Sequence, residues 1–162
     1  MLLDRSPTGM KEILLVEDSD QDAEVVGAAL RSLGVINPVR RLRHGGEALG
    51  YLIWAEEIAP IGPPLPSVLL LDIRLPGLTG YEILEYLQKR PAFASTLKLV
   101  LSHIADTQGI KKSYAFGAQS FLSKPITQFE LRELVTAFPT HWLLAAGSTL
   151  SRTPKYASLF AA

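Results

Sequence analysis

The chain has 162 residues, of which 48% are hydrophobic, and this is the size and composition of one domain with a full hydrophobic core. Sixteen basic residues balance sixteen acidic ones, so no overall charge recruits nucleic acid or an anionic membrane. The absence of cysteine excludes a disulfide framework, a thiolate metal site and a cysteine nucleophile, and it is typical of a protein of the reducing cytoplasm.

The two ends of the chain differ from its middle in pattern. Residues 1–10 lack a long apolar run, so we expect a disordered N-terminal lead-in and no secretory signal. No stretch approaches the ~20 uninterrupted apolar residues that a membrane-spanning helix requires. We therefore expect residues 11–146 to form the folded domain and residues 147–162 to form a C-terminal tail.

From residue 11 onward, apolar runs of strand length alternate with segments of helical periodicity. The expected strands are residues 13–16, 39–43, 68–71, 97–101 and 119–123. The expected helices span about residues 20–33, 79–91 and 106–116, and two further helices begin at about residues 45 and 127. Thr79 with Glu82, and Thr127 with Glu130, form S/T-x-x-E capping boxes where two of these helices begin. The alternation predicts a doubly wound α/β fold, a five-stranded parallel sheet with five helices.

Two local features of the predicted fold bear on its surfaces. Pro139 interrupts the last apolar stretch, so we expect a kink or a break there. Trp142 and the two leucines after it favour a dimer surface over ordinary core, because tryptophan is over-represented in interfaces. Arg40, Arg41 and Arg43 lie on a short strand, where charged side chains protect a sheet edge from pairing with other molecules.

Polar side chains stand where four of the predicted strands end. They are Glu17 with Asp18, then Asp72, Ser102 and Lys124. The carboxyl ends of parallel strands open onto one edge of the sheet, so we expect these residues to become neighbours. Three converging carboxylates repel one another and favour a hard divalent cation such as Mg²⁺.

The same cluster indicates phosphoryl chemistry. Asp72 is central in the sheet order and is the expected nucleophile toward phosphorus, which would yield an aspartyl-phosphate. Lys124 would supply a cation to the phosphoryl oxygens, and the hydroxyl of Ser102 would donate a hydrogen bond to one of them.

Four segments together resemble the receiver domain of two-component response regulators. They read ILLVEDS, LLLDIRLPGLTG, LVLSHIAD and FLSKPIT, and the resemblance covers about residues 11–138. It implies a flavodoxin-like sheet in the order 2-1-3-4-5 and a phosphoryl group received by Asp72 from a histidine kinase. It also implies that Mg²⁺ is held by Asp18, Asp72 and the backbone carbonyl of Arg74, with Glu17 contributing through water. By the same resemblance, Ser102 and Phe121 would be the switch pair.

Three features are similar to the stand-alone regulators that are paired with bacterial phytochromes. They are the absence of a second domain, the proline-rich loop at residues 58–66 and the aromatic, apolar end of the last helix. This similarity implies a phytochrome-type kinase as partner, a homodimer built on the last helix, and an output through protein contact without nucleic acid or membrane. It implies no enzymatic activity beyond phosphotransfer and dephosphorylation at Asp72.

Two residues depart from the receiver pattern. Arg74 stands where the family usually has an uncharged or small residue, and its side chain could reach Glu17 or the phosphoryl group. His103 stands where a small residue is usual and could narrow the approach to Asp72. Arg74 also occupies the place of the second Asp in the D-x-D pattern of haloacid-dehalogenase phosphatases. The alternative that stays open is a pseudo-receiver, a constitutive protein-binding module that is not phosphorylated.

Overall fold

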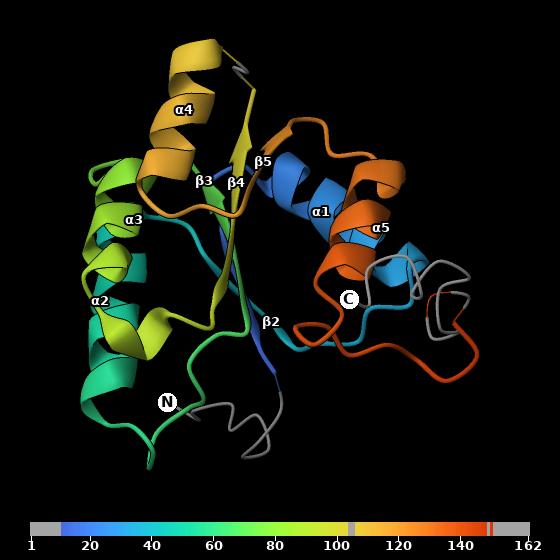
Figure 1. Cartoon of the computed structure of the whole chain (residues 1–162), viewed down its shortest axis with the longest axis horizontal. Coiled ribbons are helices and arrows are strands. Elements are labelled where there is room, and N and C mark those ends of the chain that lie inside the picture. The colour runs from blue at the N-terminus through green and yellow to red at the C-terminus, as the bar shows by residue number, and fades with distance from the viewer. Residues whose placement is uncertain (1–10, 104–105, 149, 151–162) are drawn as a thin grey trace, which may run out of the picture.

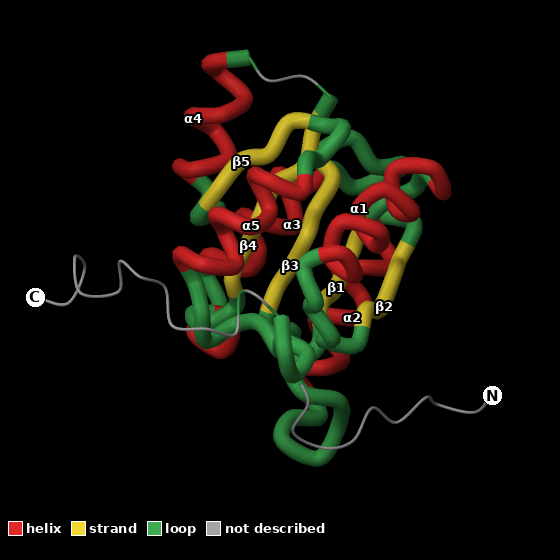
Figure 2. The backbone as a smooth tube through the Cα atoms, turned by 90° about the vertical axis from the view of Figure 1, so that its right-hand side faces the viewer, coloured by secondary structure: helices red, strands yellow, loops and turns green. Residues whose placement is uncertain are grey.

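The computed structural model describes residues 11–103, 106–148 and 150, and in them a five-stranded parallel sheet lies between helices (Figure 1). The strands are β1 (Ile13–Val16), β2 (Val39–Leu42), β3 (Val68–Asp72), β4 (Leu97–Ser102) and β5 (Ser120–Ser123). The helices are α1 (Asp20–Ser32), α2 (Gly45–Glu57), α3 (Gly80–Gln88), α4 (Thr107–Ala115) and α5 (Gln128–Ala137). The sheet order is β2-β1-β3-β4-β5, which confirms the predicted fold and places β2 and β5 at the two edges (Figure 2).

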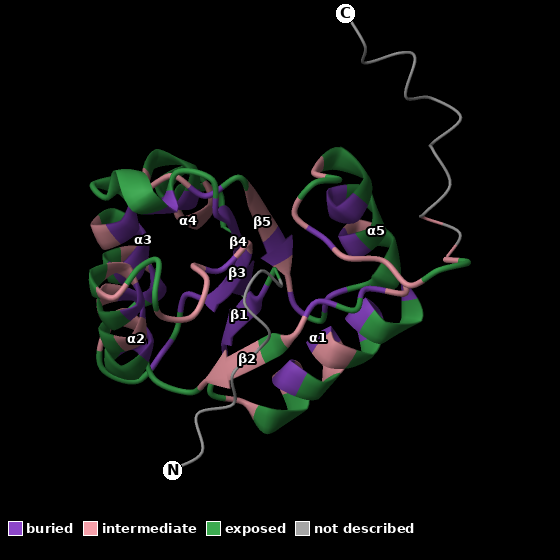
Figure 3. Ribbon diagram, turned by 90° about the horizontal axis from the view of Figure 1, so that it is seen from below, coloured by how far each residue is buried: buried purple, intermediate pink, exposed green. Residues whose placement is uncertain are grey.

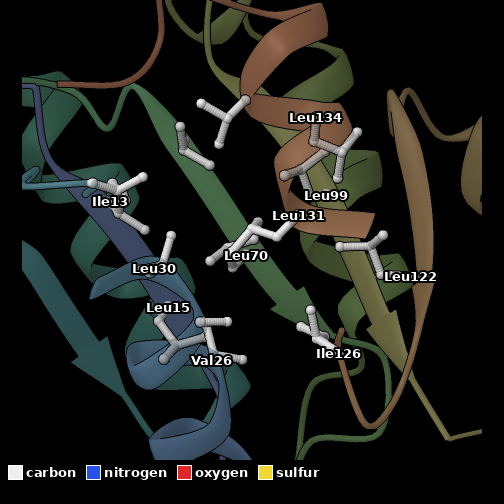
Figure 4. Packing of buried hydrophobic residues seen from close by; sticks show 14 of the residues in the cluster. Ile13, Leu15, Val26, Leu30, Leu70, Leu99, Leu122, Ile126, Leu131 and Leu134 are labelled. Carbon is white, nitrogen blue, oxygen red and sulfur yellow. The ribbon is translucent and has the colours of Figure 1, made fainter. Parts of the chain in front are cut away.

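Helices cover both faces of the sheet, with α2 and α3 on one face and α1 and α5 on the other (Figure 3). Successive strand residues point to opposite faces, so β1 divides its side chains between two cores. Leu14 packs on the α2 and α3 side. Leu15 packs under α1 and α5, as Figure 4 shows. Because both faces are covered, all four residues of β1 are buried, which explains its uninterrupted apolar run.

Local signals in the sequence account for the ends of several helices. Both expected capping boxes are present. The hydroxyls of Thr79 and Thr127 accept from the backbone amides of the glutamates three residues later, and the carboxylates of these glutamates accept from the backbone amides of the two threonines. Gly34 follows α1 with a positive φ of 77°, a conformation that a glycine adopts without steric cost. The sequence did not predict the short 3-10 helix η1 (Pro91–Phe93), which lies between α3 and β4.

The chain breaks at Pro139, as expected, and then returns along the amino ends of the strands. Val35 and Leu144 form an antiparallel bridge, and the amide of Ile36 donates to the carbonyl of Leu143 (2.8 Å). Trp142 is only 4% exposed and belongs to the core under α1 and α5. The expectation that Trp142 lies on a dimer surface is therefore wrong, because the returning segment folds it inward.

The buried side chain of Asn37 fixes this returning segment. Its amide nitrogen donates to the carbonyls of Lys11 (3.0 Å) and His141 (3.2 Å), and its oxygen accepts from the amide of Leu143 (2.6 Å). Asn37 is 5% exposed, so these bonds satisfy an amide that would otherwise be buried without partners.

The predicted terminal segments are described only in part. The N-terminal lead-in and residues 151–162 of the expected tail lie outside the described residues. Of the expected tail, the hydroxyl of Ser148 donates to the carbonyl of Leu33 (3.1 Å), and Leu150 packs against the core under α1 and α5. Among the described helices, none has the length and apolar character needed to cross a bilayer.

Candidate functional site

Residues from four strands meet at the carboxyl edge of the sheet. Val16 pairs in register with Leu71, so Glu17 and Asp72 follow side by side on neighbouring strands. Ser102 pairs in register with the last residue of β5, and the amide of Lys124 then donates to the carbonyl of Ser102 (2.9 Å). The parallel register thus brings the predicted polar residues to one place, as expected from the strand ends.

Three carboxylates form the acidic part of the site. Glu17, Asp18 and Asp72 each place a carboxylate oxygen within 4.8 Å of the other two. Glu17 and Asp72 are buried, whereas Asp18 is exposed, so the cluster opens to solvent on one side. An all-oxygen set of this kind, with room for water, fits a hard divalent cation.

The ammonium of Lys124 lies among the carboxylates. Its Nζ contacts Oε2 of Glu17, lies 3.0 Å from Oδ2 of Asp72 and 3.1 Å from Oδ2 of Asp22. The side chain of Lys124 is only 3% exposed, so little water takes part in these contacts. The other oxygen of Asp72 accepts from the backbone amide of Arg74 (3.0 Å).

The burial of these groups changes their proton affinities. Burial raises the pKa of Glu17 to about 7, although the hydrogen bond from Lys124 acts to lower it. For Lys124, burial acts to lower the pKa, but its bonds to Glu17 and Asp72 prevail and raise it. Burial also acts to raise the pKa of Asp22, and bonds from Lys124 and His103 outweigh it and lower the pKa. The lysine is therefore held in its charged form.

The two residues that depart from the receiver pattern leave the acidic cluster accessible. The side chain of Arg74 is exposed and forms no ion pair with any carboxylate in the described part of the chain. His103 has a side chain that is 60% exposed, and its Nε2 lies 2.9 Å from Oδ2 of Asp22. A hollow of about 530 Å³ is open beside Asp18, Asp72, Arg74 and His103.

The expected switch residues lie on the two strands at the β5 side of the site. Ser102 ends β4 and is 4% exposed. Phe121 lies on β5, is half-buried and packs against the core under α2 and α3. The movement of this pair, and a metal contact by the carbonyl of Arg74, stay predictions.

Sequence reasoning missed Asp22 as part of this site. In the sequence it indicates only an acidic first turn of a helix, which the helix dipole favours on its own. In the structure the amide of Asp22 donates to the hydroxyl of Ser19 (3.2 Å), and its carboxylate faces Lys124 and His103. The available signal was its place in the first turn after β1, beside the strand end that carries Glu17 and Asp18.

The arginines on the edge strand β2 and directly after it form ion pairs within the molecule. Arg41 and Arg43 both bind Oδ1 of Asp20, at 2.7 and 2.5 Å, and Nε of Arg41 donates to the carbonyl of Glu17 (3.1 Å). Arg40 binds the buried carboxylate of Glu12 at 3.0 Å. The contacts of Arg41 and Arg43 hold the β1–α1 loop, which carries the acidic pair, against the end of β2, whereas the partner of Arg40 precedes β1.

Comparisons with known proteins agree with this geometry. The family model described as "Response regulator receiver domain" matches residues 13–136. The probable methanogenesis regulatory protein FilR2 of Methanothrix harundinacea is 31% identical over 131 residues, which cover 81% of this chain and 83% of that protein.

Two similar solved structures are of phytochrome-associated or metal-bound regulators. The Mn(2+)-bound form of response regulator Rcp1, a protein of Synechocystis, has a TM-score of 0.65 and 28% identity, covering 84% of this chain and 99% of that one. The phosphorylated cyanobacterial phytochrome response regulator RcpA has a TM-score of 0.65 and 29% identity, covering 83% of this chain and 94% of that one.

Proposed function

Because the chain belongs to the family of response regulator receiver domains, we propose that it accepts a phosphoryl group on Asp72 from a histidine kinase and signals by a conformational change. The observation that carries the proposal is the contact of Lys124 with both Asp72 and Glu17 at the open acidic edge of the sheet. This arrangement places a nucleophilic carboxylate beside a fixed cation that can bind phosphoryl oxygens.

The transfer is a displacement at phosphorus. A carboxylate oxygen of Asp72 forms the new O–P bond while the N–P bond of a phosphohistidine breaks, and the imidazole of the kinase leaves with the electron pair and takes up a proton. Lys124, already 3.0 Å from Asp72, balances the charge that the phosphoryl oxygens bring into the site. The amide of Arg74 orients the carboxylate of Asp72 through its bond to Oδ1.

The acidic cluster supports Mg²⁺ as the cofactor. Glu17, Asp18, Asp72 and the carbonyl of Arg74 would hold it, and when bound it supplies positive charge that lets an anionic phosphate approach three carboxylates. The Mn(2+)-bound form of the similar Rcp1 supports a divalent cation at such a site. Glu17 is buried, and additional positive charge beside its carboxylate would offset part of the cost of that burial.

The expected readout is a change at protein-binding surfaces. On phosphorylation, the hydroxyl of Ser102 would bind a phosphoryl oxygen and Phe121 would turn inward. The similarity to phytochrome-associated regulators supports a phytochrome-type kinase in the cytoplasm as partner. By the same similarity, a homodimer would form through the α5 region, where Phe129 is 69% exposed. The domain itself would carry out no chemistry beyond phosphotransfer and dephosphorylation at Asp72.

The test is intact-mass analysis after incubation with Mg²⁺ and acetyl phosphate, then with a candidate kinase. We expect one phosphoryl adduct on the wild type, none on Asp72→Asn, and an undiminished adduct on the control Glu24→Gln, whose carboxylate pairs with Arg31 on the surface. If neither reagent gives an adduct on the wild type, the protein is a pseudo-receiver and the proposal is wrong. The pseudo-receiver alternative rests partly on the side chain of Arg74, which could reach the acidic cluster. That side chain is exposed in the structure, which weakens this argument.

A further inference from the structure

Lys124 has no donor to spare in the structure described above. Its ammonium carries three N–H donors, and three carboxylates surround it, those of Glu17, Asp22 and Asp72. A phosphoryl group on Asp72 would need at least one of these donors. The donor that now faces Asp72 can pass to the phosphoryl group, and any second bond from Lys124 to the phosphoryl oxygens requires the release of Glu17 or Asp22.

The three partners differ in what their release costs. The side chain of Glu17 is 0% exposed, and removing its ammonium partner would leave a carboxylate buried without water. Asp72 carries the phosphoryl group and stays beside the lysine. The side chain of Asp22 is 22% exposed, so water can replace the ammonium there. Ion pairs that water reaches are weak and exchange at low cost.

Asp22 has a second hydrogen-bond partner, His103, which does not move with Lys124. His103 Nε2 lies 2.9 Å from the same Oδ2 that contacts Lys124, and His103 is the residue directly after Ser102. The backbone of Asp22 is fixed by the hydroxyl of Ser19, so the carboxylate cannot follow the lysine far. When Lys124 turns away, the carboxylate of Asp22 keeps a hydrogen bond to His103.

We propose that Asp22 is a positioning residue of the phosphoacceptor site: it competes with the phosphoryl group for Lys124, and His103 compensates it once the lysine is released. The inference deepens the proposed function and rests on it. Asp22 thereby sets how readily the site takes up phosphate and ties α1 to the β4–α4 connection that carries His103.

The first test measures the affinity for beryllofluoride, a stable phosphoryl mimic, by calorimetry in the presence of Mg²⁺. Asp22→Asn keeps the shape of the side chain but removes the charge that holds Lys124. We expect this variant to bind beryllofluoride roughly two- to fivefold more tightly than the wild type, the range of one partly exposed ion pair. Glu24→Gln removes a surface carboxylate from the same helix, and its affinity should equal that of the wild type.

The second test uses His103. His103→Ala leaves Asp22 dependent on Lys124 alone, so the affinity for beryllofluoride should fall by about twofold or more. In the Asp22→Asn background the same substitution should change nothing, because the carboxylate that His103 compensates is gone. This double-mutant cycle separates the proposed role from a direct bond between His103 and the phosphoryl mimic.

The outcomes distinguish this inference from the proposed function. If the wild type fails to bind beryllofluoride with Mg²⁺, the proposed function itself is wrong. If the wild type binds but Asp22→Asn binds equally or more weakly, only the role of Asp22 is wrong. Equal effects of His103→Ala in both backgrounds would overturn the compensation by His103. Melting curves of each variant by circular dichroism verify that it is folded.

Discussion

In the described part of the chain, two buried lysines have contrasting surroundings. Lys124 faces three carboxylates, which hold it charged. Lys98 is 6% exposed, and its Nζ donates to the carbonyls of Phe93 (2.9 Å) and Thr96 (3.0 Å) without a carboxylate partner. Burial therefore lowers the pKa of Lys98. One lysine serves the site, and the other joins η1 to β4 at the opposite end of the sheet.

The lowered pKa of Lys98 predicts a pH dependence of stability. Between its folded-state pKa and its ordinary value near 10.5, the unfolded chain binds more protons than the folded one, so the free energy of unfolding rises with pH. The slope is at most about 1.4 kcal/mol per pH unit. Lys98→Met should lose this rise in urea unfolding measured over a pH series that approaches 10.5 from below. The exposed control Lys111→Met should keep it, and equal profiles for Lys98→Met and wild type would contradict the prediction.

Lys124 should couple phosphorylation to the switch without being needed for uptake of phosphate. Lys124→Ala leaves Asp72 in place as nucleophile but removes the contact that joins the β5–α5 loop to the phosphoryl oxygens. We expect acetyl phosphate to give an adduct on the variant in the presence of Mg²⁺, and we expect the wild type, but not the variant, to change its oligomeric state on phosphorylation. Size-exclusion chromatography of the wild type and the variant, with and without acetyl phosphate, measures this. A shift in Lys124→Ala as large as that in the wild type would contradict the prediction.

At the level of elements, the segment after α5 illustrates what the sequence predicts and what it leaves open. Pro139 signals the end of the helix, and α5 does end at Ala137. The inward position of Trp142 was not predicted, because an apolar run looks the same whether it covers its own core or a partner. The contacts that fold Trp142 inward come from Asn37 and from Val35, which forms the bridge with Leu144. Asn37 and Val35 lie about a hundred residues earlier in the sequence.

The functional site shows the same division between what the sequence predicts and what it leaves open. Strand ends and parallel topology are local patterns, so the sequence predicted the meeting of Glu17, Asp18, Asp72 and Lys124. The role of Asp22 depends on side-chain directions across three elements, which no periodicity encodes. The 3-10 helix η1 was missed for a similar reason, since a three-residue turn has no repeat to detect.

The returning segment should contribute a large share of the stability of the core under α1 and α5. Trp142→Ala removes a side chain that is 4% exposed, and we expect a loss of about 3–5 kcal/mol in the free energy of unfolding. The matched control is Trp54→Ala on α2, whose side chain is 39% exposed and should cost about 1 kcal/mol or less. Urea unfolding followed by circular dichroism compares them. Equal losses would mean that the segment does not pack as described.

For the molecule as a whole, stability should depend on the divalent cation. A ligand that binds only the folded chain stabilises it by mass action, by about 2.7 kcal/mol at a concentration a hundredfold above its Kd. For a domain of this size, we expect Mg²⁺ at that level to raise the Tm by roughly 5–10 °C. EDTA should reverse the rise, and Asp18→Asn should abolish it, because it removes one of the three clustered carboxylates. A rise of the same size in Asp18→Asn would place the cation elsewhere.

The two ends of the sheet carry different tasks. The acidic cluster lies at the carboxyl ends of the strands, and the segment after α5 crosses their amino ends, where it contacts Asn37 and Ser67. A strand of five residues separates these ends by about 16 Å.

This separation makes residue 150 a convenient anchorage for biophysical work. A linker attached there would emerge two residues after Ser148, which binds the carbonyl of Leu33, near the amino ends of the strands and remote from Asp72. A biosensor surface or a fluorophore tethered through that point would leave the hollow beside Asp72 unobstructed, so the binding of a candidate kinase could be tested on the immobilised protein.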